Sequence, residues 1–209
     1  MALHYERDPA AIYDQSFRTI REEGAEALAC LPETARDLAI RIAHSCGMVD
    51  AIDDLALSPD AVEAGRAALA GGAHILVDAE MVRHGIIARN LPAGVEVVCL
   101  LNDPRVPAMA RETGTTRSAA QVDLWDLEGA VVAIGNAPTA LFRLLERLDA
   151  GAPRPAVILG FPVGFVGAAE SKAELERSPR GVPFAALRGR RGGSAVAAAA
   201  VNALVSGLA

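Results

Sequence analysis

The stretch AVVAIGNAPTALF, residues 130–142, indicates a strand, a turn and the start of a helix in immediate succession. Ala130–Ile134 is a continuous apolar run without polar alternation, which is typical of a strand buried on both faces of a parallel sheet. Gly135 allows the chain to turn, and Pro138 suits the first position of a helix, where its missing N–H needs no partner. Because the segment through Gly151 continues as a helical candidate, this stretch predicts one βα unit.

The same alternation extends along the chain on both sides of this unit. Further continuous apolar runs occupy residues 74–79, 95–101, 156–161 and 183–189. Helical candidates occupy residues 117–127, 168–177, most of the first 70 residues and the alanine-rich tail 195–209. Alternating strands and helices predict a three-layer α/β domain with a mainly parallel sheet and an N-terminal helical region. We expect residues 1–209 to form a single domain.

Composition narrows the class of protein. Of the 209 residues, 52% are hydrophobic and 22% are charged, as expected for a globular chain that buries a substantial core. The net charge of −6 argues against a general nucleic-acid binder. It leaves room for a local basic pocket, which would attract an anionic small molecule.

The cysteines and the two ends of the chain bear on its compartment. The odd number of cysteines (Cys30, Cys46 and Cys99) and the absence of a CxxC pair indicate neither a disulfide framework nor a zinc site. The charged N-terminal segment lacks the apolar region of a signal peptide, and Asn202 interrupts the apolar tail. We therefore expect a cytoplasmic protein that does not span a membrane.

Unusual loops directly follow each predicted strand. In a parallel sheet these loops emerge at the carboxyl edge, where ligands bind in open α/β folds. In GNAPT, residues 135–139, the exposed N–H groups of the turn can hold a carboxylate or phosphate. In RGRRGGS, residues 188–194, the arginines add positive charge and Ser194 can cap the final helix. Arg117, at another helix start, can hold a carboxylate with two hydrogen bonds.

RIAHSCG, residues 41–47, holds the one candidate for proton transfer. On a helix Asp37, Arg41 and His44 share a face, and His44 lies in the last turn, where the helix dipole favours an imidazolium. The residues alone leave several interpretations open: a surface histidine, a Cys46 nucleophile, a metal site with His74 and His84, or an acid–base histidine.

The motifs together resemble one enzyme family. RIAHSCG, DAEMVRHGI, TTRSAA, AIGNAPTALF, PVGFVGAAESK and GRRGGSAVAAAAVNAL are similar to segments of precorrin-8X methylmutase, of corrin (cobalamin) biosynthesis. The resemblance implies an isomerase that moves a methyl group from C-11 to C-12 of precorrin-8X and yields hydrogenobyrinic acid. It also implies a flavodoxin-like fold, a homodimer with active sites near the subunit interface, and no metal or redox cofactor. By this resemblance His44 is the proton donor.

The substrate of that family is a macrocycle ringed with carboxylates, for which arginines and helix N-termini are suitable receptors. We expect the substrate contacts to be Ser16, Arg41, Met81, Arg117, Ser118, Asn136, Thr139 and Ser194. The apolar side chains of Met81, Phe161, Val163 and Phe165 are candidates to cover the flat faces of the ring, although Phe161 equally suits the core. We expect Glu170 and Lys172 to pair structurally.

Three alternatives remain at the level of sequence. The first is the same reaction on the cobalt-bearing substrate, a cobalt-precorrin-8 methylmutase. The second is a tetrapyrrole carrier that binds without conversion, and the third is a nucleotide-binding protein that uses GNAPT and GRRGGS as phosphate loops. Against the third, no magnesium-holding acidic motif accompanies those loops. Neighbouring enzymes of the corrin pathway are further possible partners.

Overall fold

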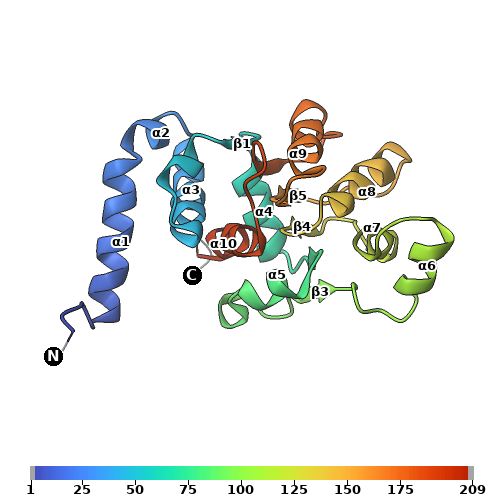
Figure 1. Cartoon of the computed structure of the whole chain (residues 1–209), viewed down its shortest axis with the longest axis horizontal. Coiled ribbons are helices and arrows are strands. Elements are labelled where there is room, and N and C mark those ends of the chain that lie inside the picture. The colour runs from blue at the N-terminus through green and yellow to red at the C-terminus, as the bar shows by residue number, and fades with distance from the viewer. Residues whose placement is uncertain (1–2, 207–209) are drawn as a thin grey trace.

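A central six-stranded sheet organises the molecule, whose computed structural model describes residues 3–206 (Figure 1). The strands are β1 (Leu55–Leu57), β2 (Ile75–Val77), β3 (Val97–Cys99), β4 (Val131–Ile134), β5 (Val157–Gly160) and β6 (Phe184–Leu187). Their spatial order is β1-β6-β5-β4-β2-β3. Strands β2 to β6 are parallel, with Val131 opposite Val157, while β1 pairs antiparallel with β6. The mainly parallel sheet predicted from the apolar runs is confirmed.

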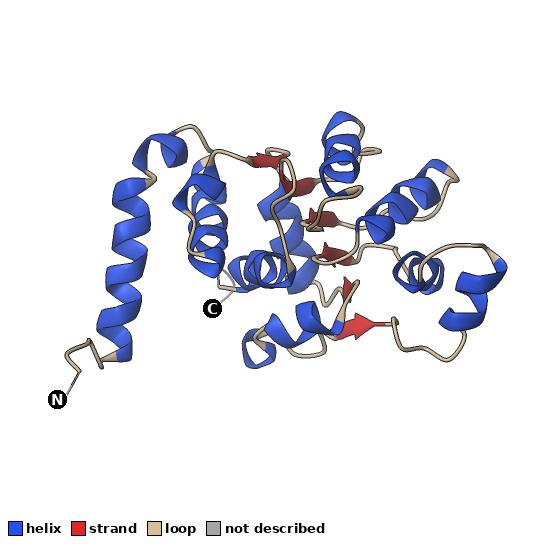
Figure 2. Cartoon of the chain, viewed as in Figure 1, coloured by secondary structure: helices blue, strands red, loops and turns tan. Residues whose placement is uncertain are grey.

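The helices cover both faces of this sheet (Figure 2). They are α1 (Pro9–Glu23), α2 (Ala25–Ala29), α3 (Glu33–Cys46), α4 (Ala61–Ala70), α5 (Glu80–Gly85), α6 (Val106–Glu112), α7 (Arg117–Ala120), α8 (Pro138–Asp149), α9 (Ala168–Arg177) and α10 (Ser194–Val205). Short 3₁₀ helices occupy Val49–Ile52, Ala88–Asn90 and Gln121–Leu124. Helices α3, α4, α5 and α10 lie on one side, and α7, α8 and α9 lie on the other.

The order of the parallel strands defines the fold. Without β1, the order β3-β2-β4-β5-β6 is the flavodoxin-like arrangement, in which the chain reverses direction across the sheet between its first and third strands. Here that switch point lies between β2 and β4, and the loops after the parallel strands share its carboxyl edge. The expected three-layer flavodoxin-like domain is therefore confirmed.

Successive residues of one strand supply two separate cores. Ile75 and Val77 face the core shared with α3, α4 and α10, whereas Leu76 faces the core shared with α8. Both faces of the sheet are buried, which explains why the strands are continuous apolar runs. Helix α10 is buried on most sides between α3 and the sheet, as its alanine-rich sequence predicts. The last residues of the predicted tail helix, 207–209, lie outside the described residues.

The N-terminal helical region is confirmed except at one place. Strand β1 falls within the segment expected to be helical, because three apolar residues are too short a run to reveal a strand. Helix α1 packs on α3 through Phe17 and Ile20 and lies away from the sheet (Figure 1).

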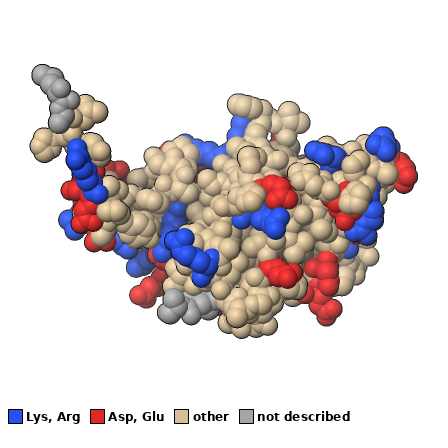
Figure 3. Space-filling view, turned by 90° about the horizontal axis from the view of Figure 1, so that it is seen from below, with Lys and Arg blue, Asp and Glu red and all other residues tan. Residues whose placement is uncertain are grey.

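The surface carries both signs of charge. On the face seen in Figure 3, basic and acidic side chains are interspersed, and no basic patch extends across the view. Within residues 3–206, no helix combines the length and the apolar character needed to cross a membrane.

Candidate active site

His44 lies near the C-terminal end of α3 and is exposed. The helix ends at Gly47, whose φ of 69° is left-handed and whose N–H donates to the carbonyl oxygen of Ala43 at 2.9 Å. Glycine adopts this conformation without steric cost, which explains the end of the helix here. His44 is therefore held on a helix, three residues before the glycine that ends it.

Helix α1 supplies the surroundings of the imidazole. Ser16 Oγ lies 3.0 Å from His44 Nδ1, a hydrogen-bonding distance. The ring of Phe17 packs against the imidazole with centroids 4.9 Å apart, and Tyr13 meets it edge-on at 6.1 Å. Since Nδ1 is engaged by Ser16, Nε2 is the nitrogen left for an external group.

A cavity of about 340 Å³ opens beside His44. Tyr13 and Phe17 of α1 and Arg41 of α3 form one side of it. The opposite side is apolar and consists of the Gly85–Ile87 segment and the small side chains of α10. A mostly apolar lining with a few polar groups is typical of a small-molecule site.

Asn202 fixes the far wall of this cavity. Its side-chain oxygen accepts a hydrogen bond from the N–H of Ile87 at 2.9 Å, and its side-chain nitrogen donates to the carbonyl of Gly85 at 3.1 Å. These bonds satisfy backbone groups where α5 ends, and they join that segment to α10. Sequence reasoning used Asn202 only as a break in an apolar tail. An amide within an otherwise apolar helix is a signal that could have identified this role.

Arg41 reaches the same cavity from the helix that carries His44. Its Nε lies 3.2 Å from Asp37 Oδ2, and its guanidinium lies 5.6 Å from the centre of the Phe17 ring. The expected shared face of Asp37, Arg41 and His44 is confirmed by these contacts and by the cavities that they line. Ser16, Arg41 and His44 are therefore brought together.

The cysteine and metal interpretations find no support in this geometry. The thiol of Cys46 donates to the carbonyl of Ile42 at 3.3 Å, while His44 is engaged by Ser16. Burial raises the pKa of Cys99 to about 11, so this thiol stays protonated at neutral pH. Within residues 3–206, no three His, Cys, Asp or Glu side chains lie close enough together to hold a metal ion.

The turn after β4 already holds a carboxylate of the protein itself. Asp78, fully buried at the end of β2, accepts hydrogen bonds from the N–H groups of Gly135 (2.8 Å), Asn136 (3.0 Å) and Ala137 (2.6 Å). Burial raises the pKa of Asp78, and these bonds act in the opposite direction. The expectation that these N–H groups would hold a substrate anion is therefore corrected, because Asp78 occupies them.

The arginines of RGRRGGS are also largely occupied. Arg188 pairs with Glu176 at 2.6 Å, and Arg191 pairs with Asp50 at 2.7 Å. Arg190 lies over the ring of Phe165 at 5.4 Å. Two of the three guanidinium groups are thus neutralised by the protein's own carboxylates, which weakens this loop as an anion receptor.

Ser194 does not cap the final helix as expected. The N-cap position belongs to Gly193, with a φ of 129° that favours glycine, and α10 begins at Ser194. Gly193 also donates its N–H to the carbonyl of Phe161 at 2.9 Å, which fixes the loop one residue before the serine. Ser194 instead packs closely against Gly135, and its neighbour Ala195 lines the His44 cavity.

A second group of the expected contacts lies beside α7. Thr139 Oγ lies 2.8 Å from the Oγ of Thr116, the residue that caps α7, so it lies near Arg117 and Ser118. Asn136 lies at the turn that Asp78 holds. Together with Arg111, Arg117 lines a separate cavity of about 360 Å³. Arg117 does not line the His44 cavity.

The apolar candidates divide into exposed and buried residues. Met81 and Phe165 are exposed over 62% and 84% of their surface, so both are available to a ligand. Phe161 is fully buried and belongs to the core.

The expected pairing of Glu170 with Lys172 is wrong. Residues two apart on a helix do not face each other. The amine of Lys172 instead points inward, is 1% exposed, and donates to the carbonyl of Arg191. Burial lowers the pKa of Lys172 to about 8.

The fold and the site first define a class: a flavodoxin-like α/β protein in which a histidine and an arginine of one helix line a mostly apolar cavity. Comparison with known proteins gives the family. The family model of precorrin-8X methylmutase matches residues 11–207. The chain is 61% identical to the precorrin-8X methylmutase of Pseudomonas aeruginosa, covering 98% of each chain. It is 40% identical to the cobalt-precorrin-8 methylmutase of Salmonella typhimurium, covering 97% of each.

A solved structure agrees with the sequence comparison. The crystal structure of precorrin-8X methylmutase from Thermus thermophilus superposes with a TM-score of 0.84 at 39% identity, covering 94% of this chain and 95% of that one. The chain therefore belongs to the precorrin-8X methylmutase family, isomerases of cobalamin biosynthesis. The family suggested by the motifs is confirmed.

Proposed function

We propose that this chain converts precorrin-8X to hydrogenobyrinic acid by moving the methyl group from C-11 to C-12, with His44 as the proton donor. The observation that carries the proposal is the imidazole itself, which Ser16 engages at Nδ1 and which borders an apolar cavity. Protonating the conjugated ring system favours the double-bond arrangement of the product. Because the reaction is an isomerisation, the donated proton is returned after the methyl group has migrated. No bond is hydrolysed, so no nucleophile is needed.

Binding supplies the rest of the catalysis. A methyl shift within one molecule depends on the conformation of the macrocycle, and a close-fitting cavity restricts that conformation. The small side chains of α10 and the rings of Tyr13 and Phe17 suit the flat faces of the ring. We assign substrate contacts to Ser16 and Arg41, which lie beside His44. The other contacts expected from the sequence stay predictions, since none of them lines the His44 cavity: Met81, Arg117, Ser118, Asn136, Thr139 and Ser194.

The test is a visible-absorption time course with precorrin-8X, for the wild type, His44→Ala and His84→Ala. His84 is exposed on α5 and serves as the matched control. The expected result is conversion by the wild type and by His84→Ala, with binding but no conversion by His44→Ala. Binding without conversion by the wild type would instead indicate a tetrapyrrole carrier.

We further propose that the substrate is the metal-free macrocycle. The supporting observation is that the relatives named for the metal-free substrate, from Pseudomonas aeruginosa and Sinorhizobium, are 61% and 59% identical, against 40% for the Salmonella relative named for the cobalt form. Parallel turnover on the two substrates tests this, and a higher kcat/KM on cobalt-precorrin-8 would reverse the assignment.

We also propose that residues 1–209 act as one domain, in a cytoplasmic homodimer, with neighbouring corrin-pathway enzymes as further partners. Helix α1 supports the dimer, because Ile12 and Tyr13 expose 47% and 45% of their surface beside the site. The cytoplasm is supported by three cysteines that are all free thiols. Sedimentation of the purified protein tests the dimer, and a monomer at micromolar concentration would refute it.

A further inference from the structure

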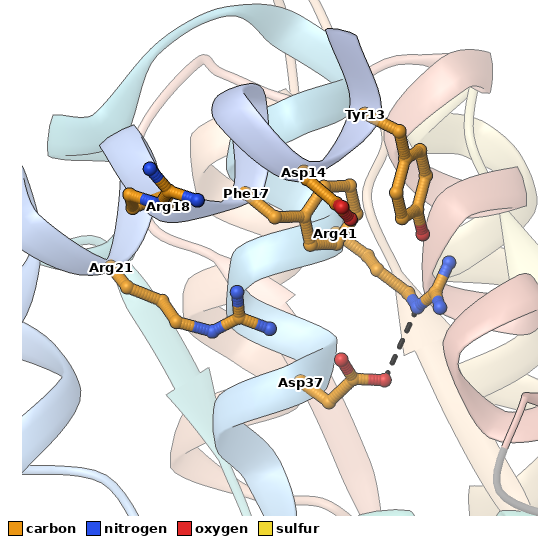
Figure 4. Close-up of a pocket in the computed structure, with 7 residues that line it drawn as sticks. All are labelled: Tyr13, Asp14, Phe17, Arg18, Arg21, Asp37 and Arg41. Carbon is orange, nitrogen blue, oxygen red and sulfur yellow. Dashed lines mark hydrogen bonds and ion pairs between the residues drawn. The ribbon is translucent and has the colours of Figure 1, made fainter. Parts of the chain in front are cut away.

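A second cavity adjoins the His44 cavity and is not used by the proposed proton transfer. It has a volume of about 380 Å³ and lies between α1 and α3 (Figure 4). The two cavities share Tyr13, Phe17 and Arg41, so a ligand that fills one can extend into the other. Their walls differ: the His44 cavity has an apolar far side, whereas this one is lined mainly by charged side chains.

The charges of this second cavity are unbalanced. Arg18 and Arg21 of α1 and Arg41 of α3 contribute three guanidinium groups, against the carboxylates of Asp14 and Asp37. Among the residues drawn in Figure 4, the one ion pair is that of Arg41 with Asp37. Within residues 3–206, neither Arg18 nor Arg21 has an acidic partner within 4.0 Å. Two cations therefore remain available at the entrance to the His44 cavity.

The ring of Phe17 contacts two of the three guanidinium groups. The guanidinium of Arg21 lies 5.8 Å from the centre of the Phe17 ring, and that of Arg41 lies 5.6 Å from it. Contact with the ring restrains the guanidinium plane and leaves N–H groups free to donate. Paired N–H donors in a plane match the two oxygens of a carboxylate.

We propose that Arg18 and Arg21 form a subsite for the peripheral carboxylates of the tetrapyrrole, which anchors the rim of the macrocycle while its ring lies beside His44. The subsite rests on the proposed function. Its ligand class follows from the geometry, since the apolar wall receives the ring and the adjoining guanidinium groups receive the acid groups on its edge. Both arginines act in binding and neither touches the migrating methyl group.

The test measures the affinity of hydrogenobyrinic acid and of its methyl ester for the wild type, Arg18→Gln, Arg21→Gln and the double variant. Arg36→Gln is the matched control, because Arg36 is exposed on α3 and does not line the cavity. We expect each single variant to weaken acid binding about 5- to 10-fold and the double variant about 30- to 100-fold. The ester should bind all variants equally, because it offers no carboxylate. The KM for precorrin-8X should rise in parallel with the loss of acid affinity, because the subsite acts in binding.

Unchanged acid binding in the double variant would overturn the subsite, as would an equal loss for acid and ester or the same loss in Arg36→Gln. A failure of the proposed function can be distinguished from a failure of the subsite. If the wild type does not convert precorrin-8X but the double variant still loses acid binding selectively, the subsite stands and the isomerase assignment falls. Thermal unfolding of each variant, expected to match the wild type, excludes a loss caused by misfolding.

Discussion

The substitution Gly135→Ala tests how the packing of the fold supports the His44 cavity. A Cβ atom at Gly135 would lie 2.8 Å from the Cβ of Ala197, 2.8 Å from Val82 Cγ2 and 2.9 Å from Ser194 Cα. All three distances are shorter than real Cβ contacts, and the last atom belongs to the backbone. Since β4, α5 and α10 meet at this point, no single rotamer change makes room.

The expected cost follows from this crowding. An extra methyl group in a well-packed core costs about 1–3 kcal/mol, and we expect about 3 kcal/mol here because the neighbours on three sides resist movement. For a chain of this size that loss lowers the Tm by about 6–12 °C. Relief of the clash displaces the start of α10, which lines the His44 cavity, so we also expect KM to rise.

Urea denaturation and steady-state kinetics measure both effects. Gly71→Ala is the matched control, because its Cβ would lie no closer than 3.4 Å to any atom and its φ is not positive. Val82→Ala, combined with Gly135→Ala, should cost less than the two single changes added together, because it removes one of the clashing groups. Wild-type stability of Gly135→Ala, or strict additivity of the pair, would refute the reasoning.

Three further predictions concern named polar groups. Ser16→Ala should lower kcat about 10-fold without lowering the Tm, because it removes the hydrogen bond to His44; a wild-type kcat would contradict this. Burial lowers the pKa of Lys172 from 10.5 to about 8, so the unfolded chain binds more protons between those pH values. The free energy of unfolding of the wild type, measured in urea relative to that of Lys172→Met, should therefore rise by about 1–3 kcal/mol from pH 8 to 10.5. A difference between the two proteins that does not change with pH would contradict this prediction. Asn202→Leu leaves the N–H of Ile87 and the carbonyl of Gly85 unpaired, so it should lower the free energy of unfolding by about 1–3 kcal/mol and raise KM. A wild-type KM would show that the Asn202 amide does not shape the site.

The sheet was predictable because its signal is local. Each parallel strand is a short apolar run, and β2, β4, β5 and β6 are buried on both faces, which explains why their sequences show no polar alternation. Strand β1 was not predictable, because its three residues form a strand only through pairing with β6, more than one hundred residues later. The α3 helix was predictable up to Gly47, since the shared face and the helix end are both properties of neighbouring residues.

The partners of the charged groups were the least predictable part of the site. The sequence of the GNAPT turn predicts exposed N–H groups. No neighbouring residue in the chain indicates that these groups donate to Asp78, which follows β2. The same holds for Arg191, whose carboxylate partner lies in the Val49–Ile52 helix. His44 and Ser16, in contrast, were both identified as candidates, but their contact depends on the packing of α1 against α3. Types of residue were readable from the sequence, and pairings between distant segments were not.

These pairings determine where a polyanion is attracted to this fold. Flavodoxin-like proteins bind ligands at the switch point of the sheet, where free N–H groups attract negative charge. Here Asp78 neutralises that turn, and two of the three arginines of the last loop, Arg188 and Arg191, are paired with Glu176 and Asp50. The unpaired guanidinium groups of Arg18 and Arg21 lie instead on α1, which is added outside the sheet and its covering helices. The proposed subsite would therefore hold the acid groups of a macrocycle on α1, next to the His44 cavity and away from the switch point of the sheet.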